Sequence, residues 1–286
     1  MATVKRTRTR DNTWQLLQAL ASRDVKGQYK RTFLGRTWSL INPLAQIAIY
    51  WVVFGLLFRA TPAPGINSGM EIYGLWLAVG IIVWSYLSGT INDCMTSYIS
   101  FSGLLKKVYL PRWTLPMSRV LSRTYTFLTE LLVLAVICGV FGGWEVLLRL
   151  IMLVPLVLLT ALFAFGLGLL LAVSTVYFRD IEHFWGILTR VWFYGSGVMF
   201  PLGIVQSAQE ELVERGWTFF GTEIPLVTLF QLNPAFEILT AFRRVLYDFA
   251  WPELSSILII AGWGVVLTAL AVFVYNRHQA RIVEEL

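Results

Sequence analysis

The sequence predicts an all-α membrane protein with six transmembrane helices, an N-terminal amphipathic interfacial helix, and re-entrant outer helices between spans 5 and 6. Of its 286 residues, 57% are hydrophobic and 14% are charged, whereas soluble domains carry about 25% charged residues. Several apolar runs also reach the roughly 20 residues that a helix needs to cross a bilayer. We therefore expect an N-terminal segment, residues 1–37, followed by one membrane domain, residues 38–286.

Six apolar runs follow the polar and basic N-terminal segment. They lie near residues 38–58, 72–92, 115–141, 146–177, 184–204 and 257–275. The third and fourth exceed the minimum length, which helix tilt can absorb, and Pro155 can kink the fourth. The polar segment ahead of the first run is too long for the charged start of a signal peptide, so no cleaved leader is expected.

Basic residues predict the orientation of these spans. If the amino terminus is cytosolic, all but five of the 23 Lys and Arg residues fall on the cytosolic side. The exceptions are Arg59, Arg149, Arg215, Arg243 and Arg244. The positive-inside rule therefore places both termini in the cytosol. Because this distribution explains the net charge of +6, we expect membrane lipids and no nucleic acid as partners.

Residues 203–253 are expected to form an outer gate and not a seventh span. The apolar run 224–232 is too short to cross, and the apparent helix 235–251 contains Arg243 and Arg244. Each arginine at a helix centre costs about 2.5–3.5 kcal/mol on insertion, which favours two short re-entrant or interfacial helices. The gate residues singled out are Pro201, Asn233 and Pro234.

The third span carries charges that suggest a substrate pathway. Arg119, Arg123 and Glu130 are spaced so that a helix places them on one face. Charges within a membrane usually face protein or water, so the arginines could line the cytosolic mouth of a pathway. Alternatively, the arginines reach the interface along their stems and Glu130 pairs with a neighbouring helix.

The stretch 13–38 indicates an amphipathic helix followed by a basic turn, which alone would serve as a membrane anchor. Its residues 23–38, RDVKGQYKRTFLGRTW, resemble the opening of permeases of type 2 ABC exporters that move cell-surface polysaccharides. The residues that carry the match are Arg23, Asp24, Lys26, Tyr29, Lys30, Gly35 and Trp38. GLLKKVYLP at 103–111, FRD at 178–180 and NP at 233–234 are similar to later motifs of that family. One departure is the segment 196–201, SGVMFP, where many relatives have an additional upstream proline.

The resemblance implies a transport subunit in the bacterial cytoplasmic membrane. It implies ATPase coupling by Leu104, Lys106, Lys107, Tyr109, Leu110 and Pro111, joined by the charged turn of Arg179 and Asp180. Two copies of a nucleotide-binding subunit would supply ATP hydrolysis with Mg, because the chain contains no G-x-x-x-x-G-K-[ST] loop. The substrate would be a polyprenyl-pyrophosphate-linked glycan such as an O-antigen or teichoic acid. Six helices are too few to enclose a polymer, so we expect a homodimer.

Three other functions remain open from the residues alone. A drug or small-lipid exporter of the same superfamily is disfavoured by the block at 23–38. A membrane glycosyl- or acyltransferase would need convergent acid, base or metal-binding groups, yet His183 and His278 stand apart in sequence. We therefore assign no catalytic residue, no metal ligand and no cofactor to this chain. A receptor or scaffold without transport is the third alternative.

Small residues at helical spacing predict close helix packing. Gly139 and Gly143 form one such set, and Ala164, Gly168 and Ala172 form another. Small side chains allow helix backbones to approach closely in a membrane. The sequence leaves open whether they pack within one chain or against a partner copy.

Overall fold

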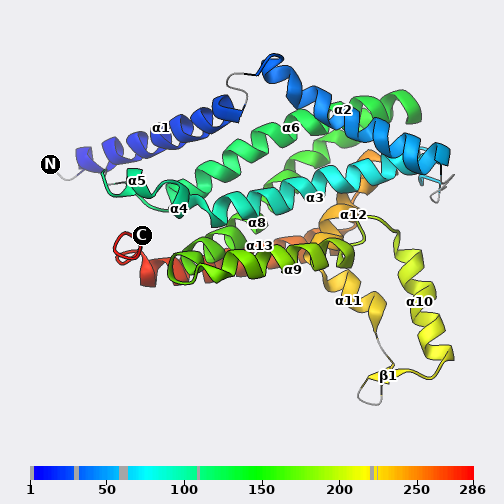
Figure 1. Ribbon diagram of the computed structural model, residues 1–286. Coiled ribbons are helices and arrows are strands. Elements are labelled where there is room, and N and C mark those ends of the chain that lie inside the picture. The colour runs from blue at the N-terminus through cyan, green and yellow to red at the C-terminus, as the bar shows by residue number, and fades with distance from the viewer. Residues whose placement is uncertain (1–2, 29–31, 58–63, 108–109, 220–221, 224) are drawn as a thin grey trace.

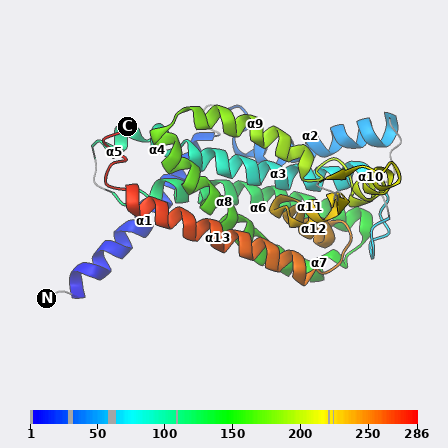
Figure 2. The same cartoon turned by 90° about the horizontal axis from the view of Figure 1, so that it is seen from below.

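The computed structural model describes residues 3–28, 32–57, 64–107, 110–219, 222–223 and 225–286. It is a bundle of long helices whose two termini lie at one end, beside α5 (Ser102–Leu105) (Figure 1). We call this the terminal end. Near the opposite, distal end, α10 (Leu202–Glu214) and α11 (Leu226–Leu232) project to one side of the long helices. A second view shows the same separation of the two ends (Figure 2).

Five helices in the described part of the chain are long and apolar enough to cross a membrane. They are Leu40–Leu57, Tyr73–Met95 (α3), Thr114–Gly142 (α6), Val146–Tyr177 and Leu254–His278 (α13). They correspond to predicted spans 1, 2, 3, 4 and 6. The prediction of a helical, multi-pass membrane protein is confirmed at this level.

The fifth predicted span, 184–204, does not form one long helix. Its counterpart is α9 (Asp180–Gly195), which ends before a turn in which Gly197 has a φ of 62°. Pro201 is extended and precedes α10. A positive φ suits glycine and interrupts an α-helix, so the chain breaks at this turn. A sixth crossing is not confirmed and stays a prediction.

Proline and π-helical geometry divide two of the predicted spans. The first consists of α2 (Trp38–Tyr50) and a π-helix, η2 (Trp51–Leu57). The fourth consists of α7 (Val146–Arg149), a 3₁₀ turn, η3 (Leu150–Met152), and α8 (Leu153–Tyr177). Pro155 has no N–H to donate to the carbonyl four residues earlier, so it belongs in a first helical turn. The kink expected at Pro155 stays a prediction.

Helices α3 and α8 form the centre of the bundle. In the most apolar part of each span, 72% of α3 and 61% of Val146–Tyr177 are buried, against 17% of α13. A Cβ on Gly168 would lie 2.5 Å from the Cβ of Cys94 in α3, and one on Gly166 would lie 2.6 Å from the backbone nitrogen of Thr268 in α13. Gly168 therefore packs within one chain, which answers the question that the sequence left open for this residue.

The outer segment 203–253 contains more structure than the sequence predicts. The expected pair of short helices is present as α11 and α12 (Pro234–Leu246). Helix α10 and a small antiparallel pair, β1 (Thr218–Phe219) with β2 (Thr222–Glu223), were not predicted, and the pair is a local departure from an all-α fold. Two-residue strands carry too little alternation to be recognised in a sequence. The re-entrant position of these helices in a membrane stays a prediction.

Helix α1 (Thr3–Gln28) packs along α6 at the terminal end. Leu17 and Leu20 are each 5% exposed, and Val25 is also buried, whereas Trp14 is 55% exposed. Part of the apolar side of α1 thus faces protein, whereas Trp14 is left accessible. The interfacial position of the helix stays a prediction.

Candidate functional site

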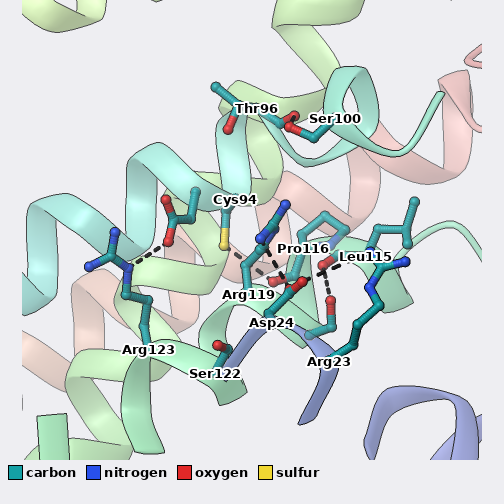
Figure 3. Close-up of polar contacts among 12 residues, drawn as sticks. Arg23, Asp24, Cys94, Thr96, Ser100, Leu115, Pro116, Arg119, Ser122 and Arg123 are labelled. Carbon is teal, nitrogen blue, oxygen red and sulfur yellow. Dashed lines mark hydrogen bonds and ion pairs between the residues drawn. The ribbon is translucent and has the colours of Figure 1, made fainter. Parts of the chain in front are cut away.

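A cluster of charged residues joins α1 to α6 at the terminal end (Figure 3). Nη1 of Arg119 lies 3.1 Å from Oδ2 of Asp24, and Nη2 of Arg23 lies 3.9 Å from Oδ1 of the same carboxylate. The guanidinium carbons of both arginines lie 4.8 Å from the ring centroid of Phe101. The chain therefore holds two cations, one carboxylate and one aromatic ring in a single cluster, which we call the α1–α6 cluster.

Burial sets the electrostatics of the α1–α6 cluster. Burial raises the pKa of the Asp24 carboxyl above its usual value, while the neighbouring Arg119 and Arg23 lower it in part. The side chain of Asp24 is 11% exposed and that of Arg119 is 23% exposed. A pair that is withdrawn from water in this way is screened less by salt than an exposed pair. The contact can therefore hold α1 on α6.

A second ion pair lies next to the first along α6. Nε of Arg123 is 2.5 Å from Oδ2 of Asp93, near the end of α3, and Glu130 is partly buried further along the helix. Arg119 and Arg123 are therefore close together, as their spacing predicts, but each contacts a different carboxylate. A bound pyrophosphate would have to share these arginines with, or take them from, Asp24 and Asp93. The predicted pathway role stays a prediction.

Sequence reasoning missed Asp93 and Phe101, which complete these contacts. Asp93 lies one residue beyond the predicted end of the second span, so its position near Arg123 depends on how α3 and α6 pack. Phe101 looks like one more apolar residue in a chain with 19 phenylalanines. Its proximity to the coupling motif at 103–111 was the available signal.

The predicted ATPase-coupling segment lies in the connection between α3 and α6, which we call the basic projection. This connection contains two single helical turns, α4 (Ser97–Ser100) and α5, followed by Lys106 and Lys107, which are exposed. Leu105 and Leu110 are each 7% exposed and anchor the two sides of the projection, whereas Leu104 is half-buried and Pro111 is exposed. Tyr109 lies outside the described residues. Phe101 is at the base of this projection, so the α1–α6 cluster adjoins it.

The other predicted residues at this end are separated. Arg179 and Asp180 are exposed where α8 passes into α9. In the N-terminal motif, Lys26 is exposed, Gly35 has a φ of 53° and Trp38 begins α2, while Tyr29 and Lys30 lie outside the described residues. Within the described part of the chain, neither Arg179 nor Asp180 forms an ion pair with the α1–α6 cluster.

At the distal end, Asn233 connects α9 to α12. Its Oδ1 accepts from the backbone N–H of Ala235, 3.0 Å away, and from Nε1 of Trp192, 2.9 Å away. Its Nδ2 donates to the carbonyl of Gly195 at 2.8 Å. Pro234 follows in the first turn of α12, where its missing N–H costs nothing. Asn233 thus caps the N-terminus of α12 and connects that helix to α9.

Arg243, which would be costly to place inside a membrane, is buried inside the outer segment 203–253. It is 5% exposed, and it donates to the carbonyls of Gly197 at 2.9 Å and Val198 at 2.6 Å. Its guanidinium carbon lies 3.4 Å from the ring centroid of Trp76 in the first turn of α3. The two backbone carbonyls in the turn after α9 therefore accept hydrogen bonds from the buried guanidinium and offset part of the cost of burying its charge. Pro201 lines the adjacent pocket of about 310 Å³.

The described residues contain no group of three or more His, Cys, Asp or Glu residues that could hold a metal ion. The ion pairs between Arg119 and Asp24 and between Arg123 and Asp93 join helices to one another.

Comparison with known proteins gives consistent matches. The model of a family described as "ABC-2 type transporter" matches residues 15–210. The chain is 24% identical over 272 residues to the O-antigen export system permease protein RfbA of Myxococcus xanthus, covering 95% of each chain. A protein of the same name from Klebsiella pneumoniae is 24% identical over 273 residues, with 95% of each chain covered. The polysialic acid transport protein KpsM of Escherichia coli is 23% identical over 186 residues, 65% of this chain and 70% of KpsM.

Proposed function

Because this chain belongs to the ABC-2 type transporter family, we propose that it is the membrane-spanning subunit of an ATP-driven exporter of a lipid-linked cell-surface polysaccharide. The substrate is a polyprenyl-pyrophosphate-linked glycan, such as an O-antigen, a teichoic acid or a cell-wall polymer. The observation that carries this proposal is the match over 95% of both chains to proteins named O-antigen export permeases. A match of that extent includes the basic projection and the outer segment as well as the spans.

The terminal end faces the cytosol of a bacterium in this proposal, and the chain lies in the cytoplasmic membrane. Both termini and most basic residues are then cytosolic, as the positive-inside rule requires. Helix α9 makes the sixth crossing together with the turn that follows it. The segment 203–253, with Pro201, Asn233 and Pro234, forms the outer gate.

Energy comes from a separate protein in the proposed complex. Two copies of a nucleotide-binding ATPase subunit bind ATP with Mg, and two copies of this chain form the conduit. The segment Leu104–Pro111 enters the ATPase, and Arg179 and Asp180 contact it from the neighbouring turn. Lys106 and Lys107 support this role, because they are exposed on a short projection fixed at its base by Leu105 and Leu110.

A drug or small-lipid exporter of the same family is the main alternative. Both functions require the same kind of ATPase contact, so only the substrate distinguishes them. The curated relatives named above favour the polysaccharide. A membrane glycosyl- or acyltransferase finds no support in the described geometry of the site.

The test combines a deletion with a charge reversal. Deleting the gene should remove a polysaccharide from the cell surface and leave its lipid-linked precursor inside the cell. The full-length protein should co-purify with an ATPase subunit, and Lys106→Glu with Lys107→Glu should reduce that recovery and surface export together. Arg215→Glu, an exposed change at the distal end, is the matched control for recovery. Unchanged surface polysaccharide after deletion would contradict the substrate class.

A further inference from the structure

The pocket beside Arg243 takes its lining from several separate parts of the chain. It has a volume of about 310 Å³. Its walls come from the first turn of α3, the turn after α9, α11, α12 and the first turn of α13. These elements meet toward the distal end of the bundle (Figure 1). A ligand in this pocket would therefore contact α12 and the turn after α9 at the same time.

Two buried charges of opposite sign line the pocket without pairing with each other. Glu237 is 6% exposed and Arg243 is 5% exposed, and the ion pairs of the described chain do not join them. The Glu237 carboxylate accepts a hydrogen bond from the Ser256 hydroxyl. Nε of Arg243 has no hydrogen-bond partner among the described residues. Since buried polar atoms are normally paired, the pocket offers an unused donor together with a carboxylate that can accept further hydrogen bonds.

The remaining charges of the lining are also of both signs. Nη1 of Arg244 lies 2.5 Å from Oε1 of Glu253. The carboxylate of Asp248 accepts from the backbone N–H of Ile66. Carboxylates would repel an anionic ligand and guanidinium groups would repel a cationic one. The balance of charge therefore favours a neutral ligand.

The uncharged lining residues indicate which neutral ligand fits. Gln231 and Thr240 add an amide and a hydroxyl, which both donate and accept hydrogen bonds. Phe200 adds a half-buried aromatic ring, whereas one face of Trp76 is covered by the guanidinium of Arg243. A sugar ring carries hydroxyls that donate and accept, and it has apolar C–H faces that pack on aromatic rings. A lipid chain would leave the polar groups of the pocket without partners, which is costly.

We propose that this pocket is a binding subsite for one neutral sugar residue of the exported glycan. The inference rests on the proposed function, because it takes the glycan from there. Ligand pockets measure about 300–1,000 Å³, so a volume at the lower end of that range suits a single sugar ring better than a longer piece of polymer. A bound sugar accepts from Nε of Arg243, donates to Glu237 and packs on Phe200. It thereby connects α12 to the turn after α9.

The binding test uses the full-length chain in nanodiscs of phosphatidylethanolamine and phosphatidylglycerol, which carry no sugar. The probe is a tritium-labelled oligosaccharide released by mild acid from the lipid-linked precursor that accumulates in the deletion strain. Equilibrium dialysis measures its dissociation constant. Gln231→Leu should weaken binding about fivefold, the effect of losing one hydrogen bond. Thr240→Trp should fill the pocket and reduce binding below detection.

Matched controls carry the same changes outside the pocket. Gln206→Leu in α10 and Thr228→Trp in α11 alter exposed residues of the outer segment that do not line it, and both should bind as the wild type does. Gln231 is itself exposed, so Gln231→Leu keeps the test informative if Thr240→Trp folds poorly. Wild-type affinity in both pocket variants would overturn the subsite.

Surface export separates a failure of the subsite from a failure of the proposed function. If deleting the gene removes the surface polysaccharide but the purified wild-type chain binds no oligosaccharide, the pocket holds water only, and the subsite alone is overturned. If deletion leaves the surface polysaccharide unchanged, the proposed function and the subsite both fail. Gln231→Leu should lower export and leave recovery of the ATPase subunit at the wild-type level, because the pocket and the basic projection lie at opposite ends of the bundle.

Discussion

Among single residues, Asp24 and Arg119 form the contact that connects the N-terminal helix to the membrane bundle. Both side chains are largely withdrawn from water, and Arg119 also lies against Phe101. Removing one partner leaves the other partly buried without its counter-charge, which costs more than the pair itself contributes. This pair therefore contributes more to holding α1 in place than an ordinary surface ion pair would.

We expect Arg119→Gln and Asp24→Asn each to lower the free energy of unfolding by about 1.5–3 kcal/mol, the range for hydrogen bonds to charged groups. Thermal unfolding in detergent measures the loss, and proteolysis of α1 should become faster. The exchanged pair Asp24→Arg with Arg119→Asp should recover part of the stability. Additive losses in the Asp24→Asn, Arg119→Gln double variant would show that the two residues do not interact.

The same pair bears on the pathway hypothesis. Arg119 and Arg123 each contact a carboxylate, so an anionic substrate head group would compete with Asp24 and Asp93 for them. Guanidinium groups bind phosphates and carboxylates with the same planar geometry, which makes such an exchange chemically reasonable. Substrate binding and the attachment of α1 would then be linked.

At the scale of helices, the sequence predicts the length and apolarity of the spans well. It predicts poorly where a helix is interrupted. Five of the six apolar runs match helices that can span a membrane. The sequence did not predict the turn after Gly195. The apolar residues Val198, Met199 and Phe200 continue the hydrophobic pattern, although the positive φ of Gly197 is incompatible with a continuous α-helix. A hydropathy pattern indicates which segments are apolar, but it contains no information about the backbone φ of a single glycine.

The sequence predicted that helices pack closely, but it did not predict which residues of two helices meet. Small residues indicated close packing, yet only the structure shows that Gly168 meets Cys94 of the same chain. In the candidate site, motifs located the basic projection and the N-terminal block. The partners Asp93 and Phe101 depended on tertiary packing, which spacing along one helix cannot reveal.

The packing of α8 leads to a prediction about glycines. Gly166→Ala and Gly168→Ala should each destabilise the protein by about 1–3 kcal/mol, because the new methyl group would meet the backbone of α13 or the side chain of Cys94. Gly262→Ala on α13 is the matched control, since nothing lies within 4 Å of its added Cβ. Thermal unfolding compares the three variants. Equal stability in all three would contradict the close approach of α8 to its neighbours.

At the scale of the whole molecule, α9 leaves most of its surface uncovered by the rest of the chain. Trp185 and Trp192 attach it to the bundle, donating to Asn92 at 2.8 Å and Asn233 at 2.9 Å. Only Trp185 is buried in this helix, and Arg190 is exposed on it. If α9 makes the predicted sixth crossing, an arginine facing hydrocarbon costs about 2.5–3.5 kcal/mol. That side of α9 would then favour water or a protein partner over lipid.

The proposed homodimer explains this surface if α9 borders the conduit between two copies. Arg190→Cys should then react in intact cells with a charged thiol reagent that does not enter lipid, while Val265→Cys, exposed on the apolar face of α13, should not. The native Cys94 and Cys138 are buried and free, so the unmodified chain gives the background. Reaction at Arg190→Cys should also fall when the lipid-linked glycan occupies the conduit. If Arg190→Cys stays as unreactive as Val265→Cys, α9 lies against lipid or closely packed protein, and the conduit must be sought on another face of the bundle.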